Sequence, residues 1–225
     1  VAASSSANCF YWAYTAAKLA LEHMTPVILL TDGYLGNGSQ LFRIPKVADL
    51  PSIKPRLATP NDPDYRPFRR DEEKYARQWA LPGMEGLSHR VGGLEKCPDG
   101  PLSTDPENHA LMVNNRQEKV NRVANYIPEQ EVTGNPDADL LVVGWGGTAG
   151  ALTLAVEEMN NEGKKVAYTH FNYICPLPKN TGDILRRYKK IVVCELNNGQ
   201  FAGYLRTQYP ECPMHQYNKI MGLPF

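Results

Sequence analysis

Paired cysteines, an excess of charge and long apolar runs are all missing from this sequence. The five cysteines are widely spaced and form no Cys-x-x-Cys pair, which argues against a disulfide framework, structural zinc or an iron–sulfur cluster in this chain. The 24 basic and 24 acidic residues balance, so we expect neither nucleic acid nor a membrane as a partner. No apolar run approaches the roughly 20 residues that a membrane-spanning helix needs.

The chain also lacks an initiator methionine and a signal-peptide pattern at its start. Val1 opens a small polar segment, and Phe225 follows directly after Gly222-Leu223-Pro224. We therefore expect a piece of a longer polypeptide. The scarcity of cysteine patterns fits a reducing, cytoplasmic location.

The most ordered pattern lies between residues 139 and 163. Leu140–Val143 reads as a buried strand, a glycine-rich turn follows, and an apolar stripe at helical spacing then runs to Gly163. A second β-favouring run covers 164–168. Two strands joined by a helix are parallel when they share a sheet, so this stretch predicts an open α/β unit. The glycines of the turn are Gly144, Gly146, Gly147 and Gly150.

The first third of the chain predicts less regular structure. Helical periodicity covers 8–23, and Val27–Leu30 reads as a short buried strand that ends at the Asp32-Gly33 turn. The proline-rich stretch 45–67 predicts a linker or extended arm. A short charged helix is expected over 71–79. The residues expected on the inner side of the first helix are Phe10, Ala13, Ala17, Leu19, Ala20 and Met24.

A glycine-rich loop over 81–105 precedes the next predicted helix. Loops longer than about 15 residues are often functional, so its polar groups and the nearby histidine are candidates for a substrate-side site. Asp105 and Pro106 then predict the start of a helix that runs to about Asn125. We expect its inner side to hold Ala110, Val113, Val120 and Ala124. The candidate residues are His89, Arg90, Glu95, Lys96 and His109.

The last third continues the α/β pattern. A short helix over 182–188 leads to a third buried strand, Ile191–Cys194, and another helix follows over 201–208. Cys194 is expected to be a buried core thiol. Residues 212–225 read as extended.

Two motifs in this region leave alternatives open. The turn Gly144–Gly150 loosely fits a dinucleotide loop, but the end of the second strand, Tyr168–Asn172, has no acid for a ribose hydroxyl. Close strand–helix packing or a domain contact is therefore favoured for the turn. Glu195 can serve as a general acid or base, or it can cap backbone N–H groups or pair at an interface. We favour the structural role for Glu195, and with it for Asn197, Gly199 and Gln200.

Several segments, taken in order, resemble the α-subunit of 2-oxoacid:ferredoxin oxidoreductases of the 2-oxoglutarate type. They are LALEHMTPVILLTDG (19–33), VGGLEK (91–96) with LSTDPENH (102–109), VVGWGGTAGAL (142–152), and PLP (176–178) with CELNNGQ (194–200) and KIMGLPF (219–225). The resemblance implies that 1–45 is the tail of a thiamine diphosphate pyrimidine-binding domain and that 46–135 is a linker and insert. It implies a transketolase C-terminal-like domain over 136–225.

The same resemblance implies an enzyme complex. Its members oxidise a 2-oxoacid to an acyl-coenzyme A and pass electrons to ferredoxin, with thiamine diphosphate, magnesium and an iron–sulfur cluster held in the complex and partly by a β-subunit. We expect this chain to bind none of these groups, to contain no catalytic or metal-binding residue and to be inactive alone. It departs from the family at Lys96, where relatives often have histidine. The alternatives are a separate α/β nucleotide-binding module and a subunit-assembly module.

Overall fold

The computed structural model describes residues 1–225 as two compact units. The first unit comprises Val1–Ala13, Ile28–Arg43 and Ile127–Phe225, and the second comprises Tyr14–Val27 and Ile44–Tyr126. Helix α1, Cys9–His23, carries residues of both units. None of the helices is both long and apolar enough to cross a lipid bilayer.

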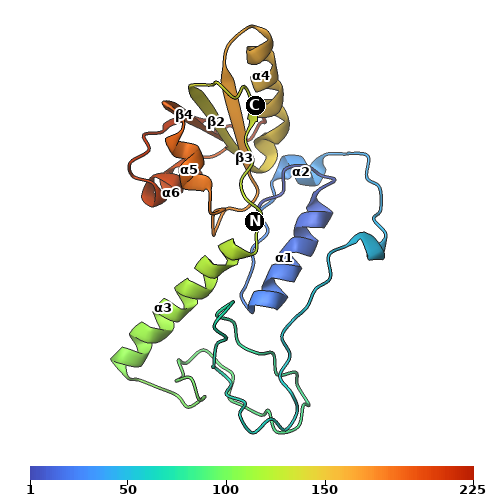
Figure 1. The fold of residues 1–225 in the computed structure, drawn as a ribbon. Coiled ribbons are helices and arrows are strands. Elements are labelled where there is room, and N and C mark those ends of the chain that lie inside the picture. Colours follow the sequence, from blue (N-terminus) through green and yellow to red (C-terminus); the bar gives the residue numbers. More distant parts are fainter. The chain divides into compact units, whose positions relative to one another are not determined.

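A five-stranded sheet forms the body of the first unit (Figure 1), in the order β1-β3-β2-β4-β5. Strands β3, β2, β4 and β5 are parallel, and only the edge strand β1 pairs antiparallel, with β3. The open, mostly parallel sheet expected from the sequence is therefore confirmed. The strands are β1 (Thr133–Gly134), β2 (Leu140–Trp145), β3 (Val166–Phe171), β4 (Lys190–Glu195) and β5 (His215–Asn218).

The alternation of side chains along β2 divides the core into two layers. Leu141 and Val143, both 0% exposed, point to one face of the sheet, where they meet residues of α5 (Thr181–Arg186) and α6 (Gln200–Gln208). Val142 points to the other face and packs in a second cluster with residues of α4 (Ala149–Asn161). Helices therefore cover both faces (Figure 1), as expected for strands that read as continuous apolar runs.

The helix after the glycine turn is only partly as predicted. Leu152 and Val156 are buried against the sheet, and Gly163 follows the helix at a φ of +80°. Leu154, another apolar residue of the predicted stripe, is 57% exposed. Two residues beyond Leu152, it lies on the opposite side of a helix with 3.6 residues per turn.

The amino-terminal part of the first unit does not form the expected buried strand. Only Leu30 makes an isolated bridge, with Ala2, and Ile28 is 74% exposed. The chain then turns into the short helix α2 (Gly33–Asn37), because the Asp32 carboxylate caps it by accepting a hydrogen bond from the N–H of Leu35 at 2.9 Å. Asp32 is therefore a helix cap and not, as the sequence predicted, part of a turn at the end of a strand.

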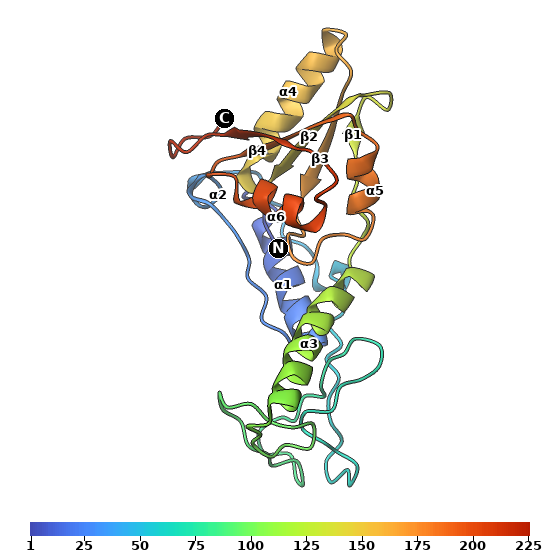
Figure 2. The same ribbon diagram turned by 90° about the vertical axis from the view of Figure 1, so that its left-hand side faces the viewer.

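The second unit is largely irregular. It contains a short 3-10 helix, η1 (Val47–Asp49), and the long helix α3 (Pro106–Arg122), which Figure 2 shows in full. The Asp105 carboxylate caps α3 by accepting from the N–H of Glu107 at 3.1 Å, and a turn of 3-10 helix, η2 (Val123–Asn125), follows. Both the cap and the end near Asn125 match the sequence prediction.

The inner faces predicted for α1 and α3 are mostly wrong. In α1 the buried residues are Ala16, Leu19 and His23, whereas Phe10 is 43% exposed. In α3 they are Met112 and Lys119, and Ala110 and Val113 are exposed. The buried stripe of α3 is displaced because Lys119 lays its aliphatic stem inside, which apolar counting does not foresee.

The charged helix expected over 71–79 is absent. The Asp71 carboxylate instead accepts from the N–H groups of Glu73, Lys74 and Ala76 at 2.9, 2.5 and 3.1 Å, and Tyr75 adopts a φ of +58°. Such side chain-to-backbone bonds offer the backbone an alternative to the helix. They form a tight turn here.

Candidate functional site

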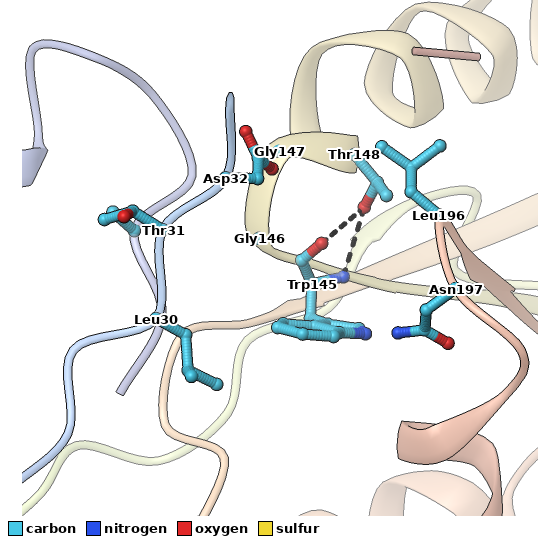
Figure 3. Close-up of a pocket in the computed structure, with 10 residues that line it drawn as sticks. Leu30, Thr31, Asp32, Trp145, Gly146, Gly147, Thr148, Leu196 and Asn197 are labelled. Atoms are coloured by element: carbon cyan, nitrogen blue, oxygen red, sulfur yellow. Dashed lines mark hydrogen bonds between the residues drawn. The ribbon is translucent and has the colours of Figure 1, made fainter. Parts of the chain in front are cut away.

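A small pocket lies at the point where the strand order of the sheet reverses. From β2 the chain passes to β3 on one side and later reaches β4 on the other side, and ligands of open parallel sheets bind at the carboxyl ends of strands at such a switch point. A cavity of about 200 Å³ occurs at this place in the first unit (Figure 3). Its lining comprises Ala3, Leu30, Thr31, Asp32, Trp145, Gly146, Gly147, Thr148, Leu196 and Asn197.

The physical constraint on the residue type differs from one glycine of the turn to the next. A Cβ on Gly144 would lie 2.5 Å from Leu152 Cδ1 and 2.9 Å from Thr148 Oγ1, so close packing of strand and helix requires glycine there. Gly146 has a φ of +61°, yet a Cβ on it would meet nothing within 4 Å, and the same open space surrounds Gly150. The close strand–helix packing favoured for the turn therefore does not apply to Gly146, where the backbone conformation is the constraint.

Thr148 closes the turn by hydrogen bonds. Its hydroxyl donates to the carbonyl of Trp145 at 2.8 Å and accepts from the N–H of Trp145 at 3.2 Å, as the dashed lines in Figure 3 show. The turn is thereby held as a short 3-10 segment, η3 (Gly146–Thr148), before α4 begins.

A carboxylate of the same unit occupies the outer side of this turn. A Cβ on Gly147 would lie 2.2 Å from Asp32 Oδ2, and Figure 3 shows Asp32 directly beside Gly147. A glycine turn before a helix attracts a phosphate through its N–H groups, but here the neighbouring charge is already negative and would repel one. Together with the absence of an acid after β3, this geometry disfavours the dinucleotide interpretation.

Glu195, at the end of β4, is fully buried and makes three hydrogen bonds. Its Oε2 accepts from the N–H of Phe201 at 3.0 Å and from Trp145 Nε1 at 3.1 Å, and its Oε1 accepts from the N–H of Ala202 at 2.9 Å. The carboxylate thus caps the first turn of α6, where a negative charge is favoured by the helix dipole. The capping role predicted from the sequence is confirmed.

The residues that follow Glu195 complete the same turn. The side-chain carbonyl of Asn197 accepts from the N–H groups of Gly199 and Gln200 at 2.7 and 3.3 Å. Gly199 has a φ of +90°, and a Cβ there would lie 2.4 Å from Gln216 Nε2. Glycine is therefore needed at this position both for conformation and for space.

Tyr168, which is buried, and His170, which is half-buried, form a polar pair that the sequence reasoning missed. The Tyr168 hydroxyl and His170 Nδ1 are 2.6 Å apart, and His170 is the register partner of Gly144 in the sheet. Burial lowers the pKa of His170 to about 4 and raises the pKa of Tyr168. The spacing of two along a strand is the signal that places both side chains on one face.

The loop candidates fall in the second unit, and the structure brings only three of them together. Glu95, Lys96 and His109 line one cavity of about 520 Å³. Glu95 accepts from Arg116 Nη1 at 2.7 Å and lies 2.5 Å from His109 Nδ1, and these partners, Arg116 first, hold the pKa of the Glu95 carboxyl below its usual range. Lys96 is buried and donates to the carbonyls of its own loop, at Gly92 and Leu94.

The other two candidates do not share this cavity. His89 Nδ1 lies 2.9 Å from the carbonyl oxygen of Leu87, and Arg90 is exposed. Four basic residues that the sequence reasoning had not selected line the cavity instead. They are Arg70, Arg77, Arg116 and Lys119.

No group of three or more His, Cys, Asp or Glu side chains is arranged to bind a metal ion. All five cysteines are free, and two of them, Cys194 and Cys212, are buried. Burial raises the pKa of the Cys194 thiol to about 11, so this thiol stays protonated and unreactive near neutral pH. The core position predicted for Cys194 is confirmed.

Comparison with known proteins gives consistent matches. Residues 138–222 match the family described as pyruvate:ferredoxin oxidoreductase core domain II. The 2-oxoglutarate oxidoreductase subunit KorA of Mycobacterium tuberculosis is 44% identical over 229 residues, which is 100% of this chain and 34% of the relative. The 2-oxoglutarate synthase subunit KorA of Methanothermobacter marburgensis is 26% identical, over 88% of this chain and 52% of the relative.

A solved structure matches the whole chain. The 2-oxoglutarate:ferredoxin oxidoreductase from Magnetococcus marinus, with 2-oxoglutarate, coenzyme A and succinyl-CoA bound, aligns with a TM-score of 0.90 and 27% identity over 100% of this chain and 39% of that chain.

The fold is an open α/β sheet, and the chain is similar in structure to part of a ferredoxin-linked oxidoreductase. More particularly, the chain is similar over its whole length to part of the α-subunits of the 2-oxoacid:ferredoxin oxidoreductases. It spans about a third to a half of the curated relatives that it matches, 34% of one and 52% of another.

Proposed function

We propose that this chain forms part of the α-subunit of a thiamine-dependent 2-oxoacid:ferredoxin oxidoreductase that acts on 2-oxoglutarate in the cytoplasm. The observation that carries the proposal is the 44% identity over the whole chain to a 2-oxoglutarate oxidoreductase subunit. The whole-chain likeness to an oxidoreductase that holds 2-oxoglutarate and coenzyme A supports the same substrate and acyl acceptor.

The reaction is the oxidative decarboxylation of the 2-oxoacid, with transfer of the acyl group to coenzyme A and of electrons to ferredoxin. Thiamine diphosphate supplies the carbanion chemistry of such reactions when it is bound. No three or more His, Cys, Asp or Glu side chains of this chain are grouped around a metal position, and all five cysteines are free. We therefore assign the magnesium, the cofactor and the cluster to other parts of the complex, including a β-subunit.

The contribution of this chain is structural in this proposal. The match over 138–222 supports a transketolase C-terminal-like domain at 136–225, with 1–45 as the tail of a pyrimidine-binding domain and 46–135 as linker and insert. Glu195 lies inside its own unit, so it supports an interface by fixing α6 and does not contact a partner itself. Gly146 and Asn197 line the pocket at the switch point of the sheet. Among the residues to which we assign a structural or interface role, these two are best placed to face a neighbouring domain or subunit.

The proposal is tested by 2-oxoglutarate-dependent viologen reduction with thiamine diphosphate, magnesium and coenzyme A present. The α-subunit that contains this segment, assembled with its β-subunit, should be active and should prefer 2-oxoglutarate to pyruvate. The pure 225-residue chain should be inactive. Turnover by the pure chain would contradict the structural role, and a low-micromolar affinity of that chain for NAD would favour a nucleotide-binding module instead.

A further inference from the structure

Basic side chains converge on the cavity of the second unit, which we call the basic cavity. Its volume is about 520 Å³, and its walls come from the segments around residues 70 and 92 and from α3. Glu95 is the one acidic residue among the lining side chains. The basic lining residues are Arg70, Arg77, Lys96, Arg116 and Lys119, together with His109.

The only carboxylate in the cavity is already engaged. Glu95 pairs with Arg116 at 2.7 Å and with His109 at 2.5 Å. Arg70, Arg77 and Lys119 take part in none of the ion pairs of the chain. Three cations therefore face one cavity with no negative charge to balance them.

The partners of these three cations are neutral. Arg70 donates through Nη1 to the carbonyl of Tyr75 at 3.1 Å, while its Nε is buried without a hydrogen-bond partner. Lys119 Nζ donates to the carbonyl of Met24 at 2.6 Å. Arg77 lies over the ring of Phe68, 4.6 Å from its centroid. Buried donors are normally satisfied, so the free Arg70 Nε marks a position where an acceptor is missing.

Burial and mutual repulsion both disfavour the charged forms of these side chains. Burial, and then the charges of Arg70, Arg77 and Arg116, lower the pKa of Lys119 to about 8. Burial and the neighbouring arginines also lower the pKa of Arg70. A group of like charges in a partly dry cavity is unfavourable by itself, and a bound anion would relieve both the repulsion and the unsatisfied donor.

We propose that the basic cavity binds a small anion with at least two negative charges, either a dicarboxylate or a phosphate group, held by Arg70, Arg77 and Arg116 with Lys119 beside them. Guanidinium groups match both anions because they donate two parallel hydrogen bonds to a pair of oxygens. The volume lies within the usual range of small-molecule pockets, about 300–1,000 Å³. The inference depends only on the second unit and is independent of the proposed enzymatic function.

The test uses calorimetric titration and thermal melts of the 225-residue chain with inorganic phosphate and with 2-oxoglutarate. Chloride and acetate at the same ionic strength are the reference anions. We expect saturable binding of at least one of the two doubly charged probes and a rise in melting temperature that the reference anions do not produce. Tighter binding of 2-oxoglutarate assigns a dicarboxylate site, and tighter binding of phosphate assigns a phosphate site.

Matched variants locate the binding. Arg77→Met and Lys119→Met each remove one cation of the cavity and keep much of the apolar stem, and each should weaken the binding at least tenfold. Arg90→Met removes the same charge from an exposed side chain outside the cavity and should bind like the wild type. Without added anion, Lys119→Met loses both a repelled charge and the hydrogen bond to the Met24 carbonyl, and a cooperative melt shows that the variant is folded.

Two results would overturn the proposal. One is that neither probe binds above the reference anions. The other is that Arg77→Met binds as well as Arg90→Met. If both probes fail and an acidic side chain of a partner subunit fills the cavity in the assembled complex, then the basic cavity is a subunit contact and not a ligand site.

Discussion

Replacement of Glu195 by alanine tests how much of the sheet's carboxyl edge depends on one carboxylate. Glu195 is 0% exposed and accepts hydrogen bonds from the backbone N–H groups of Phe201 and Ala202 and from the indole of Trp145. Alanine removes all three acceptor contacts at once and leaves α6 without its cap.

The expected loss follows from the number of donors left buried. The N–H groups of Phe201 and Ala202 lie in residues that are 3% and 0% exposed, and each unsatisfied buried donor costs about 1–3 kcal/mol. Trp145 is only half-buried, so its indole N–H can find water. We expect a loss of about 4 kcal/mol in the free energy of unfolding. This corresponds to a fall of about 8–16 °C in melting temperature at the usual 2–4 °C per kcal/mol for a chain of this size.

A graded series makes the reasoning testable. Glu195→Gln keeps one carbonyl oxygen, which can serve two of the donors, and turns an NH₂ group toward the third, so it should lose about 1–3 kcal/mol. Glu162→Ala removes an exposed carboxylate that pairs with Lys164 at 2.7 Å and should leave the free energy of unfolding nearly unchanged. Urea unfolding followed by Trp fluorescence measures all three variants. A Glu195→Ala variant within about 1 kcal/mol of the wild type would refute the capping argument.

Two further predictions concern the glycine turn and the half-buried His170. Gly146→Ala should lower the free energy of unfolding by only about 1–2 kcal/mol, the conformational cost at φ +61°. Gly147→Ala should lower it more, because the added Cβ meets Asp32. In urea unfolding, the additional change Asp32→Gly should restore part of the loss caused by Gly147→Ala and none of the loss caused by Gly146→Ala. The pKa of His170 falls from 6.5 to about 4 on folding, so between these pH values the unfolded chain binds one more proton than the folded chain. The free energy of unfolding should therefore decrease as the pH falls from about 6.5 to about 4. At 1.36 kcal/mol per pH unit the decrease is about 3 kcal/mol. His170→Gln should flatten that part of the stability–pH curve, and an unchanged slope would show that His170 is not the titrating group.

The parts of the fold that the sequence predicts well are those determined by local pattern. The strand at Leu140–Val143, the glycine turn and the helix ending at Gly163 are all found near their expected positions. Here apolar periodicity, glycine and strand length agree with one another, and such agreement between levels is what makes a segment predictable.

The sequence predictions fail where tertiary contacts, and not the local pattern, determine the structure. Periodicity allowed a helix over 71–79, but the Asp71 carboxylate satisfied the local N–H groups in a turn. In α3 the apolar residues suggested one face, and the buried Lys119 defines another. Side-chain hydrogen bonds and buried aliphatic stems of charged residues are not visible in hydrophobic spacing.

The candidate sites also divide into those that the local sequence pattern predicts and those that it does not. The capping role of Glu195 was predictable because an acid at a strand end directly precedes a helix start. The basic cavity was not, because Arg70, Arg77 and Lys119 are separated by up to about fifty residues of irregular chain. Of the loop candidates, only Glu95, Lys96 and His109 line that cavity, so the sequence reasoning identified one wall of it.

Charge placement explains why the two anion-binding patterns of this chain differ in outcome. The glycine turn at Gly146–Thr148 has the backbone of a phosphate loop, but Asp32 of the same unit lies against Gly147 and supplies the negative charge internally. The basic cavity has the opposite arrangement, with cations gathered and its only carboxylate shared between two partners. A net charge of zero over the chain therefore conceals one place where a negative charge is already provided and one where it is missing, and an added anion should stabilise only the second.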